Sequence, residues 1–400
     1  MTNQTPRGGS RPKTNREHGT WLRACRKPRG VAPCPVAQVW VVFGVILLLA
    51  SSMMGCATQE ASPSASQAGS GGLNGVFSEH FTIGGAVNSS TVLGSRELIV
   101  KHFGSLTAEN EMKPMVIHPR MGSWIPYGAD EIANLAREHG MGMRGHTLVW
   151  HQQTPGWFFS SMGAQASPEV LLERLEDHFT RMQDRYGDVV YAWDVVNEAI
   201  SDAPGEFLRP SPYLEILGED YIEEAFRLAK RIMPDAKLYY NDYSVLDPAK
   251  QDKIYTLLSG LLEKGVPIDG IGFQGHWNIY FPDSRTLERG IQRFAALGLD
   301  VQITELDVSV YRHEDRATRL KEPTPEILEL QADRYREIFQ TLVNNSQYVS
   351  NVTFWGVADD KTWLDNFPVS GRKNWPLLFA EDHSPKPAYY AVVEAAGGNP

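Results

Sequence analysis

Cysteine is scarce in this 400-residue chain and is confined to its first part. The three cysteines are Cys25, Cys34 and Cys56, and none follows position 56. A segment without cysteine can form neither a disulfide bond nor a metal site with thiolate ligands. The body of the protein is therefore predicted to fold without disulfides and without a structural zinc–thiolate centre.

The sequence also lacks the short motifs of two common enzyme classes. No Gly-x-Gly-x-x-Gly loop follows the first predicted strand, which disfavours a dinucleotide-binding fold. No His-Glu-x-x-His pair occurs, and His146 and His276 fall on different predicted strands. We therefore expect an active site that holds no cofactor and no metal ion.

Positive charge is deficient outside the first 39 residues. Residues 1–39 carry eight Lys/Arg and one acidic residue, Glu17, whereas the whole chain has a net charge of −10. The remainder is therefore strongly acidic, which argues against nucleic acid as a partner. An acidic surface fits a soluble enzyme that acts on a neutral polymer, and it is equally explained by solubility alone.

No apolar run is long enough for a comfortable membrane span, which needs about 20 residues. The longest, Val39–Ala50, follows a basic stretch and resembles the apolar region of a signal peptide. Met53-Met54-Gly55-Cys56 comes next and resembles a bacterial lipobox, in which the cysteine becomes the lipidated first residue. Residues 1–56 are thus predicted to be a signal peptide that ends at a lipobox. Ordinary secretion and an uncleaved anchor remain alternatives.

A polar segment of small residues follows Cys56. Residues 57–75 (ATQEASPSASQAGSGGLNG) offer almost no apolar surface to bury and are predicted to be a flexible linker. No repeat or second low-complexity region appears later, so residues 76–397 are predicted to form one catalytic domain. We expect a monomer that is exported and held at the cell envelope, on the outer membrane or the periplasmic face, or otherwise secreted.

Eight short apolar strands alternate with amphipathic helical segments in this domain. This alternation predicts an α/β fold with a parallel sheet, and eight units fit a closed (β/α)8 TIM barrel. Two helices, Pro168–Tyr186 and Tyr221–Met233, show apolar residues at helical spacing. The strands are predicted at Phe81–Ala86, Ser105–Ala108, Met143–Leu148, Tyr191–Val196, Lys237–Asn241, Gly270–Gln274, Val301–Thr304 and Val352–Trp355.

Polar or aromatic side chains follow almost every predicted strand, at the ends that meet at one mouth of a barrel. Glu198 follows the fourth strand and Glu305 the seventh. Three βα units separate these glutamates, so their side chains can face each other across that mouth. Glycoside hydrolysis needs such a pair of carboxyl groups, one as proton donor and one as nucleophile or base. Each glutamate alone could be only a solvent-facing strand end, but Asn197, directly before Glu198, and His276, which could hold Glu305 ionised, make a glycosidase site the better prediction.

Eight motifs in this order make the chain similar to glycoside hydrolase family 10, the barrel xylanases, from about Phe81 to Tyr390. They are LTAENEMKP (106–114), GHTLVWHQQTPGWF (145–158), WDVVNEAI (193–200), YNDY (240–243), GFQGHW (272–277), ITELDVS (303–309), WGVADDKTWL (355–364) and LLFAEDHSPKPAYYAV (377–392). The resemblance implies an endo-β-1,4-xylanase that cleaves internal xylan linkages with retention of anomeric configuration, through a covalent glycosyl-enzyme intermediate.

The same resemblance implies a role for each motif residue. Glu198 resembles the acid/base and Glu305 the nucleophile, and the other candidates resemble substrate-binding groups. Trp355 and Trp363 resemble a cap that excludes the hydroxymethyl group of glucose. The remaining substrate-binding candidates are Glu109, Asn110, Lys113, His146, Trp150, Gln153, Asn197, Tyr243, Gln274 and His276.

Two other functions compete with this interpretation. A retaining β-1,4-glucanase or a glycosidase of mixed specificity would use the same glutamate pair, although the two tryptophans argue for xylan. A non-catalytic xylan-binding lipoprotein would not need both glutamates. One position departs from the family pattern: Trp277 stands where many relatives carry an aliphatic residue, which predicts a narrowed or extended cleft beside His276.

Replacing Cys56 tests the predicted lipid anchor. Cys56→Ala should move the protein from the membrane fraction to a soluble or uncleaved form, because the thiol is the only site on this segment that a lipobox would use. Fractionation followed by immunoblotting measures the change, and Cys34→Ala is the matched control. Unchanged fractionation of the Cys56 variant would exclude lipidation at this residue.

Overall fold

The computed structural model describes residues 71–398, so the predicted signal peptide and most of the predicted linker lie outside the described residues. Helix α1 (Leu73–Val76) starts inside the last part of the segment expected to be linker. The reason is local: Leu73 and Phe77 are fully buried in the main core. Among residues 71–398, no helix combines the length and hydropathy that crossing a bilayer requires.

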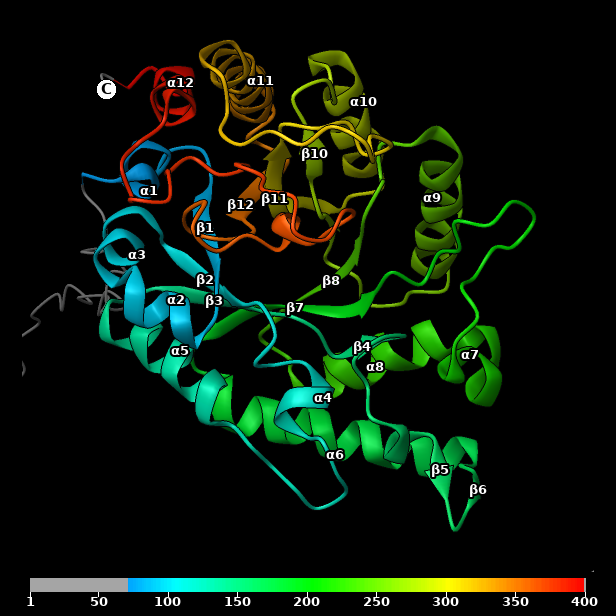
Figure 1. The fold of residues 1–400 in the computed structure, drawn as a ribbon. Coiled ribbons are helices and arrows are strands. Elements are labelled where there is room, and N and C mark those ends of the chain that lie inside the picture. Colours follow the sequence, from blue (N-terminus) through cyan, green and yellow to red (C-terminus); the bar gives the residue numbers. More distant parts are fainter. Residues whose placement is uncertain (1–70, 399–400) are drawn as a thin grey trace, which may run out of the picture. The chain divides into compact units, whose positions relative to one another are not determined.

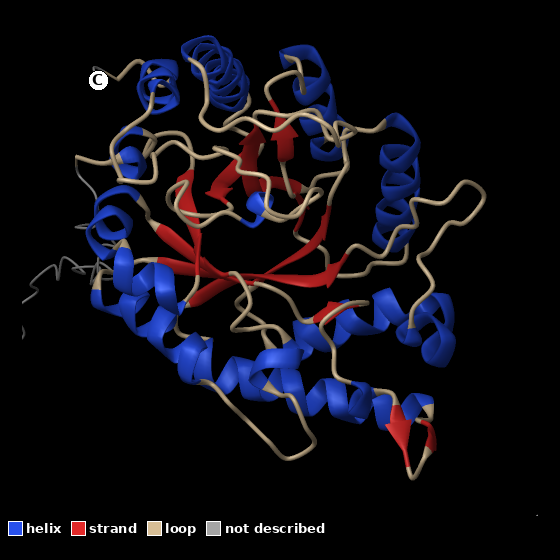
Figure 2. Cartoon of the chain, viewed as in Figure 1, coloured by secondary structure: helices blue, strands red, loops and turns tan. Residues whose placement is uncertain are grey.

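Eight parallel strands close into a barrel in the middle of the fold (Figures 1 and 2). Each pairs with its neighbours in chain order, and β12 returns to pair with β1, so no edge of the sheet is left open. The predicted (β/α)8 barrel is confirmed. The barrel strands are β1 (Thr82–Val87), β2 (Ser105–Ala108), β3 (Gly142–Gly145), β7 (Val190–Asn197), β8 (Lys237–Asp242), β9 (Gly270–Phe273), β11 (Asp300–Ser309) and β12 (Val349–Phe354).

Two short strands extend the barrel sheet at the carboxyl ends of its strands. β4 (Val149–Trp150) pairs with β7, and β10 (His276–Asn278) pairs with β11. Both carry residues of the predicted site, and neither was expected as a separate strand. β5 (Ser160–Ser161) and β6 (Ala164–Gln165) form a small hairpin away from the barrel.

Helices surround the barrel, and four of the longer ones begin at a side-chain cap. Side chains of Ser167, Asp247, Asp283 and Thr324 accept bonds from the first turns of α6, α9, α10 and α11. The predicted helix at Pro168–Tyr186 is α6. The helices are α2 (Ser89–Gly94), α3 (Arg96–His102), α4 (Pro114–Ile117), α5 (Tyr127–Glu138), α6 (Pro168–Tyr186), α7 (Pro212–Leu217), α8 (Tyr221–Ile232), α9 (Pro248–Glu263), α10 (Ser284–Ala295), α11 (Pro325–Asn344) and α12 (Pro387–Ala395), with single turns at Gly156–Phe158, Gly218–Asp220 and Trp363–Asp365.

The barrel interior contains a buried ion pair as well as apolar side chains. Arg144 on β3 contacts Asp194 on β7 at 2.7 Å and 3.2 Å, and both side chains are about 1% exposed. Arg144 Nε also donates to Gln302 on β11 at 2.5 Å. Three strands are thus joined by charge-assisted bonds, which are stronger than bonds between neutral groups.

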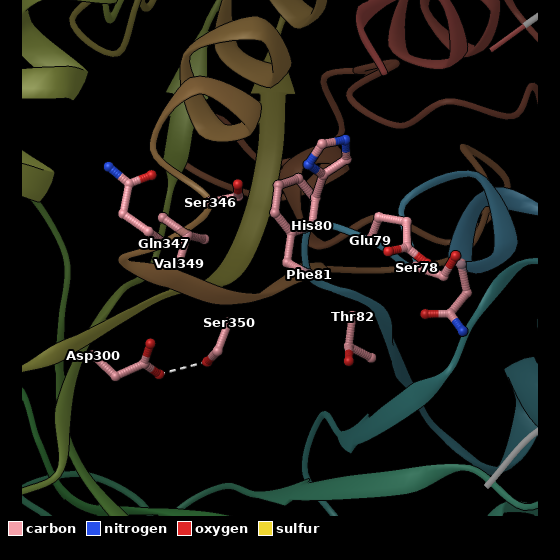
Figure 3. A pocket seen from close by; sticks show the side chains of 11 residues that line it. Ser78, Glu79, His80, Phe81, Thr82, Asp300, Ser346, Gln347, Val349 and Ser350 are labelled. Carbon is pink, nitrogen blue, oxygen red and sulfur yellow. Dashed lines mark hydrogen bonds between the residues drawn. The ribbon is translucent and has the colours of Figure 1, made fainter. Parts of the chain in front are cut away.

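A cavity of about 430 Å³ opens at the amino ends of the strands, at the end of the barrel opposite the predicted site. Its wall includes the starts of β1, β11 and β12, and Figure 3 shows Asp300 bonded there to Ser350. Asp300 also accepts a bond from Tyr239 at 2.6 Å. Burial raises the pKa of Asp300, against the lowering effect of these bonds. The groups at this end of the barrel bond mainly to one another.

Removal of Arg144 should destabilise the protein strongly. Arg144→Met leaves Asp194 charged and buried without its main partner, which costs about 3–5 kcal/mol. The same substitution at Arg231, whose ion pair with Glu176 is more than half exposed, should cost less than about 1 kcal/mol. Denaturant unfolding of both variants measures the difference, and equal losses would contradict a structural role for the buried pair.

Candidate active site

The predicted site residues gather at the carboxyl ends of the barrel strands. β7 ends at Asn197 and β9 at Phe273, and Glu305 lies in the second half of β11, beyond its last paired residue with β9, Ile303. Because the strands are parallel and closed, residues that are far apart in the sequence meet at this mouth. Most of the candidate residues lie at this mouth.

Glu198 is the first residue beyond β7 and has an unusual backbone conformation. Its φ of 56° lies in the left-handed region, which costs a non-glycine residue about 1–3 kcal/mol. The bond from its N–H to the carbonyl of Asn241, at 2.9 Å, holds this turn. The carboxylate is 9% exposed and accepts bonds from Trp150 Nε1 at 2.8 Å and from Gln274 Nε2 at 3.0 Å. Each oxygen therefore has a fixed donor.

Glu305 is held in the same way from the opposite side of the site. Its side chain is buried, and Oε1 accepts a bond from Asn241 Nδ2 at 2.9 Å. Oε2 lies 3.2 Å from His276 Nε2. The N–H of Glu305 donates to the carbonyl of Gln274, whose side chain donates to Glu198. Gln274 thus ties both carboxylate-bearing residues into one network.

His276 lies between two carboxylates. Nδ1 is 3.0 Å from Asp307 Oδ2, while Nε2 faces Glu305. Burial lowers the pKa of His276, but the charge of Asp307 and the bonds to both carboxylates outweigh burial and raise it to about 10. The ring is therefore a cation that donates from both nitrogens. His276 thus bridges Glu305 and Asp307.

The environment keeps Glu305 ionised. Burial would raise the pKa of its carboxyl, but the bond from His276 and the nearby histidine side chains bring it below the ordinary value. A carboxylate with a depressed pKa and little exposure carries its negative charge over a wide pH range. This is the state that a nucleophilic carboxylate requires.

A polar wall of the site is formed by residues that follow β2 and by Trp150 on β4. Lys113 Nζ donates to Asn110 at 3.2 Å and lies 5.0 Å from the centre of the Trp150 ring. Burial lowers the pKa of Lys113, opposed first by the charge of Glu305. Glu109 accepts a bond from Asn88 at 3.0 Å, and burial raises its pKa despite that bond. This wall offers a buried cation, Lys113, and a partly buried acidic group, Glu109, near Glu198.

Two tryptophans line the rim of the site near His276. Trp355 lies edge-on to His146 and His276, with centroids 5.4 and 6.4 Å apart. Trp363 donates from Nε1 to Asp307 at 2.8 Å and is 38% exposed. The bond and the partial exposure place its indole at the rim with a fixed orientation, as a cap over the site requires.

Four other candidates differ in how directly they contact the hydrogen-bond network around Glu198 and Glu305. They are His146, Asn197, Gln153 and Tyr243. His146 Nδ1 lies 2.9 Å from Asp194, below the mouth, and the amides of Asn197 and Asn241 are 3.0 Å apart. Gln153 bonds through its backbone carbonyl, which accepts from Met115 at 2.8 Å. Tyr243 contacts Asp202 and Arg209 on the outer side of Glu198.

The expectation for Trp277 is wrong. Side chains alternate along β10, so that His276 and Asn278 face the site side while Trp277 turns to the opposite face. Its indole is 8% exposed and packs in the main core. Trp277 therefore fills volume behind the site and does not narrow or extend the cleft.

Two contributors were not among the candidate site residues. Arg209 donates from Nε to the carbonyl of Glu198 at 3.1 Å and binds Asp202 and Tyr243. Asn88 orients Glu109. Asn88 follows β1 directly, so its position at a strand end was a usable signal. Arg209 lies in a long loop after β7, where no periodic pattern indicated its contact.

Loss of the His276 cation should change the pH dependence of hydrolysis. In His276→Asn the buried Glu305 loses a donor and a positive charge, so its pKa should rise towards the value that burial favours. The acidic limb of kcat/KM on a chromogenic xylobioside, which needs ionised Glu305, should then move to higher pH. His139→Asn, on the outer surface, should leave the profile unchanged. An unmoved limb in the His276 variant would contradict the proposed electrostatic role.

Known proteins resemble this chain over nearly the whole described part. The sequence pattern of Glycosyl hydrolase family 10 matches residues 72–395. Endo-1,4-beta-xylanase B of Paenibacillus barcinonensis is 47% identical over 80% of this chain and 97% of its own length. A beta-1,4-xylanase of Dictyoglomus thermophilum is 48% identical over 80% of this chain and 90% of its own.

Solved structures agree with this relationship. A Paenibacillus barcinonensis xylanase in complex with a conduramine derivative has a TM-score of 0.79, with 47% identity over 80% of this chain and 98% of that one. An endo-1,4-beta-xylanase of Caldicellulosiruptor owensensis also gives a TM-score of 0.79, with 47% identity over 80% and 99% of the two chains. With the motifs, the closed barrel and the two held glutamates, these matches show that the chain belongs to glycosyl hydrolase family 10.

Proposed function

We propose that this protein is an endo-1,4-β-xylanase that retains the anomeric configuration of its substrate. The observation that carries the proposal is the pair Glu198 and Glu305, each with both carboxylate oxygens bonded, on strands that meet at one barrel mouth. The names of the family relatives support xylan as the substrate. A non-catalytic binding role would leave both glutamates without a use.

The chemistry follows from the two environments. Glu305, kept anionic beside His276, attacks the anomeric carbon while Glu198 gives its proton to the leaving oxygen. The glycosidic bond breaks and an ester bond forms between Glu305 and the sugar. Glu198, now a carboxylate, takes a proton from water, whose oxygen then attacks the anomeric carbon and frees Glu305. Trp150 and Gln274 orient Glu198 through both steps.

Substrate recognition is assigned to the polar wall and to the tryptophans at the rim. Buried Lys113, partly buried Glu109 and exposed Asn110 offer hydrogen-bonding groups to the sugar hydroxyls on one side of Glu198. Trp355 and Trp363 form the cap that discriminates xylose from glucose by excluding a hydroxymethyl group. A relative from Thermoclostridium stercorarium, 44% identical over 80% of this chain, is called a thermostable celloxylanase, so β-1,4-glucan remains the second substrate to test.

We further propose that the enzyme acts outside the cytoplasm as a monomer. The polymeric substrate requires export, and the predicted signal peptide supplies it. Lipidation of Cys56 and tethering by the small polar linker would place the catalytic domain at the cell envelope. One chain carries every side chain assigned to the site, so no second copy is needed for catalysis.

Azide rescue separates the roles of the two glutamates. Glu305→Ala should abolish turnover, and azide should restore it with formation of an α-glycosyl azide, because azide fills the space of the nucleophile. Glu198→Ala should stay partly active on aryl xylosides with good leaving groups, which need no proton, and azide should then give the β-product. NMR of the products identifies each anomer.

Two controls make the proposal falsifiable. Product chromatography on xylan, xylo-oligosaccharides and carboxymethyl cellulose should show xylo-oligosaccharides as the main products. Release of a first product with inverted configuration by the unmodified enzyme would contradict the retaining mechanism. Absence of activity on xylan, with activity on cellulose, would instead favour the glucanase.

A further inference from the structure

A row of aromatic rings leads from the nucleophile along the rim of the site. The ring of His276, which contacts Glu305, lies 4.9 Å from that of Trp363. Trp363 stacks on Phe367 at 4.9 Å with an interplanar angle of 20°, and Phe367 lies 6.2 Å from His313. Phe367 is 46% exposed, more than expected for a ring that serves only packing. The row offers a continuous surface beyond the Trp363 cap.

The row of ring contacts ends at His313, and Arg312, the residue before it in the sequence, stacks on Tyr280. The guanidinium carbon of Arg312 lies 3.9 Å from the centre of the Tyr280 ring, and Tyr280 is 47% exposed. Both belong to the carboxyl-end extensions of neighbouring strands, β11 and β10. The N–H of Ile279 donates to the carbonyl of Ser309 at 3.0 Å, which fixes the turn with Tyr280 against the end of β11. The backbone thus holds the pair in place.

Among residues 71–398, no salt bridge involves Arg312, and its side chain is exposed. The segment 312–322 carries four basic and three acidic residues, whereas the whole chain has a net charge of −10. A guanidinium stacked on an aromatic ring keeps its outer N–H groups free for a bidentate acceptor. Arg312 is therefore a local cation on an acidic protein.

The chemistry of the aromatic row and of Arg312 points to one class of ligand. The C–H face of a sugar ring packs on aromatic side chains, and a planar carboxylate matches the fork of a guanidinium. An unsubstituted xylan chain has hydroxyls but no anion for Arg312. We infer that Arg312 and Tyr280 form a rim subsite for xylan that carries carboxylate side groups, that is, uronic acid substituents. The inference rests on the proposed xylanase activity and specifies its substrate.

Arg312→Gln tests this subsite without touching the catalytic groups. On glucuronoxylan the variant should raise KM about two- to fivefold with kcat unchanged, as expected for the loss of an exposed ion pair. On neutral linear xylo-oligosaccharides it should match the unmodified enzyme. Arg289→Gln, the same charge change on the exposed face of α10, is the matched control. The difference should shrink as ionic strength rises, because salt screens exposed charges.

A change in the substrate completes the test. Reduction of the uronic carboxyl groups of glucuronoxylan to alcohols should raise KM for the unmodified enzyme as much as Arg312→Gln does, and should not affect the variant further. Equal KM values for enzyme and variant on the acidic polymer would overturn the subsite. If the unmodified enzyme failed on neutral xylan as well, the proposed function itself would be wrong, so the two failures are distinguishable.

Discussion

The pairing of the first strand with the last is the constraint on which the rest of the structure depends. Backbone partners from Thr82↔Asn351 to Gly85↔Phe354 join β1 to β12 and leave the barrel without an edge. Because all eight strands are parallel, closure directs their carboxyl ends to one mouth. Glu109, directly after β2, and Glu305 in β11 therefore contribute to one site, although they lie 196 positions apart in the sequence.

Closure also determines the electrostatics, because it buries charges that must then find partners. Glu198 and Glu305 are 9% and 5% exposed, and every carboxylate oxygen of the two accepts a hydrogen bond or contacts His276. The pattern continues below the mouth, where His146 contacts Asp194 and Asp194 pairs with Arg144. A buried charge without such bonds would be costly. The same contacts that stabilise the fold therefore hold the reacting groups in position.

Side chains at the rim of the site differ from those in the interior in their exposure and pairing. Trp363, Phe367 and Tyr280 remain partly exposed, and Arg312 has no acidic partner among the described residues. Exposed interactions of this kind are individually weak and are screened by salt. They contribute little to folding, so the rim is free to select among substituted chains of the polymer. The interior determines the reaction, and the rim adjusts which form of the substrate is preferred.

Local signals in the sequence were sufficient for much of the fold and for the catalytic pair. The eight strands were predictable from short apolar runs, and α6 from its Ser167 cap, Pro168 and helical periodicity. Glu198 was predictable because it directly follows a buried strand, and Glu305 because it follows the apolar run predicted as a strand at Val301–Thr304, although β11 continues to Ser309. These features depend on residues within a few positions of one another, which is the range over which a sequence pattern carries information.

Only the tertiary structure decided what depends on contacts between distant segments. Three features could not be predicted from the sequence. They are the burial of Trp277, the bond from Arg209 to the Glu198 carbonyl, and the Arg144–Asp194 ion pair. A side chain's partner across the barrel is set by strand register and closure, and neither is visible in a run of neighbouring residues. The sequence by itself thus determined the fold class and singled out the two glutamates that are proposed to react. The barrel decided their hydrogen-bond partners and the depressed pKa of Glu305, because those arise only when strands far apart in the chain are packed together.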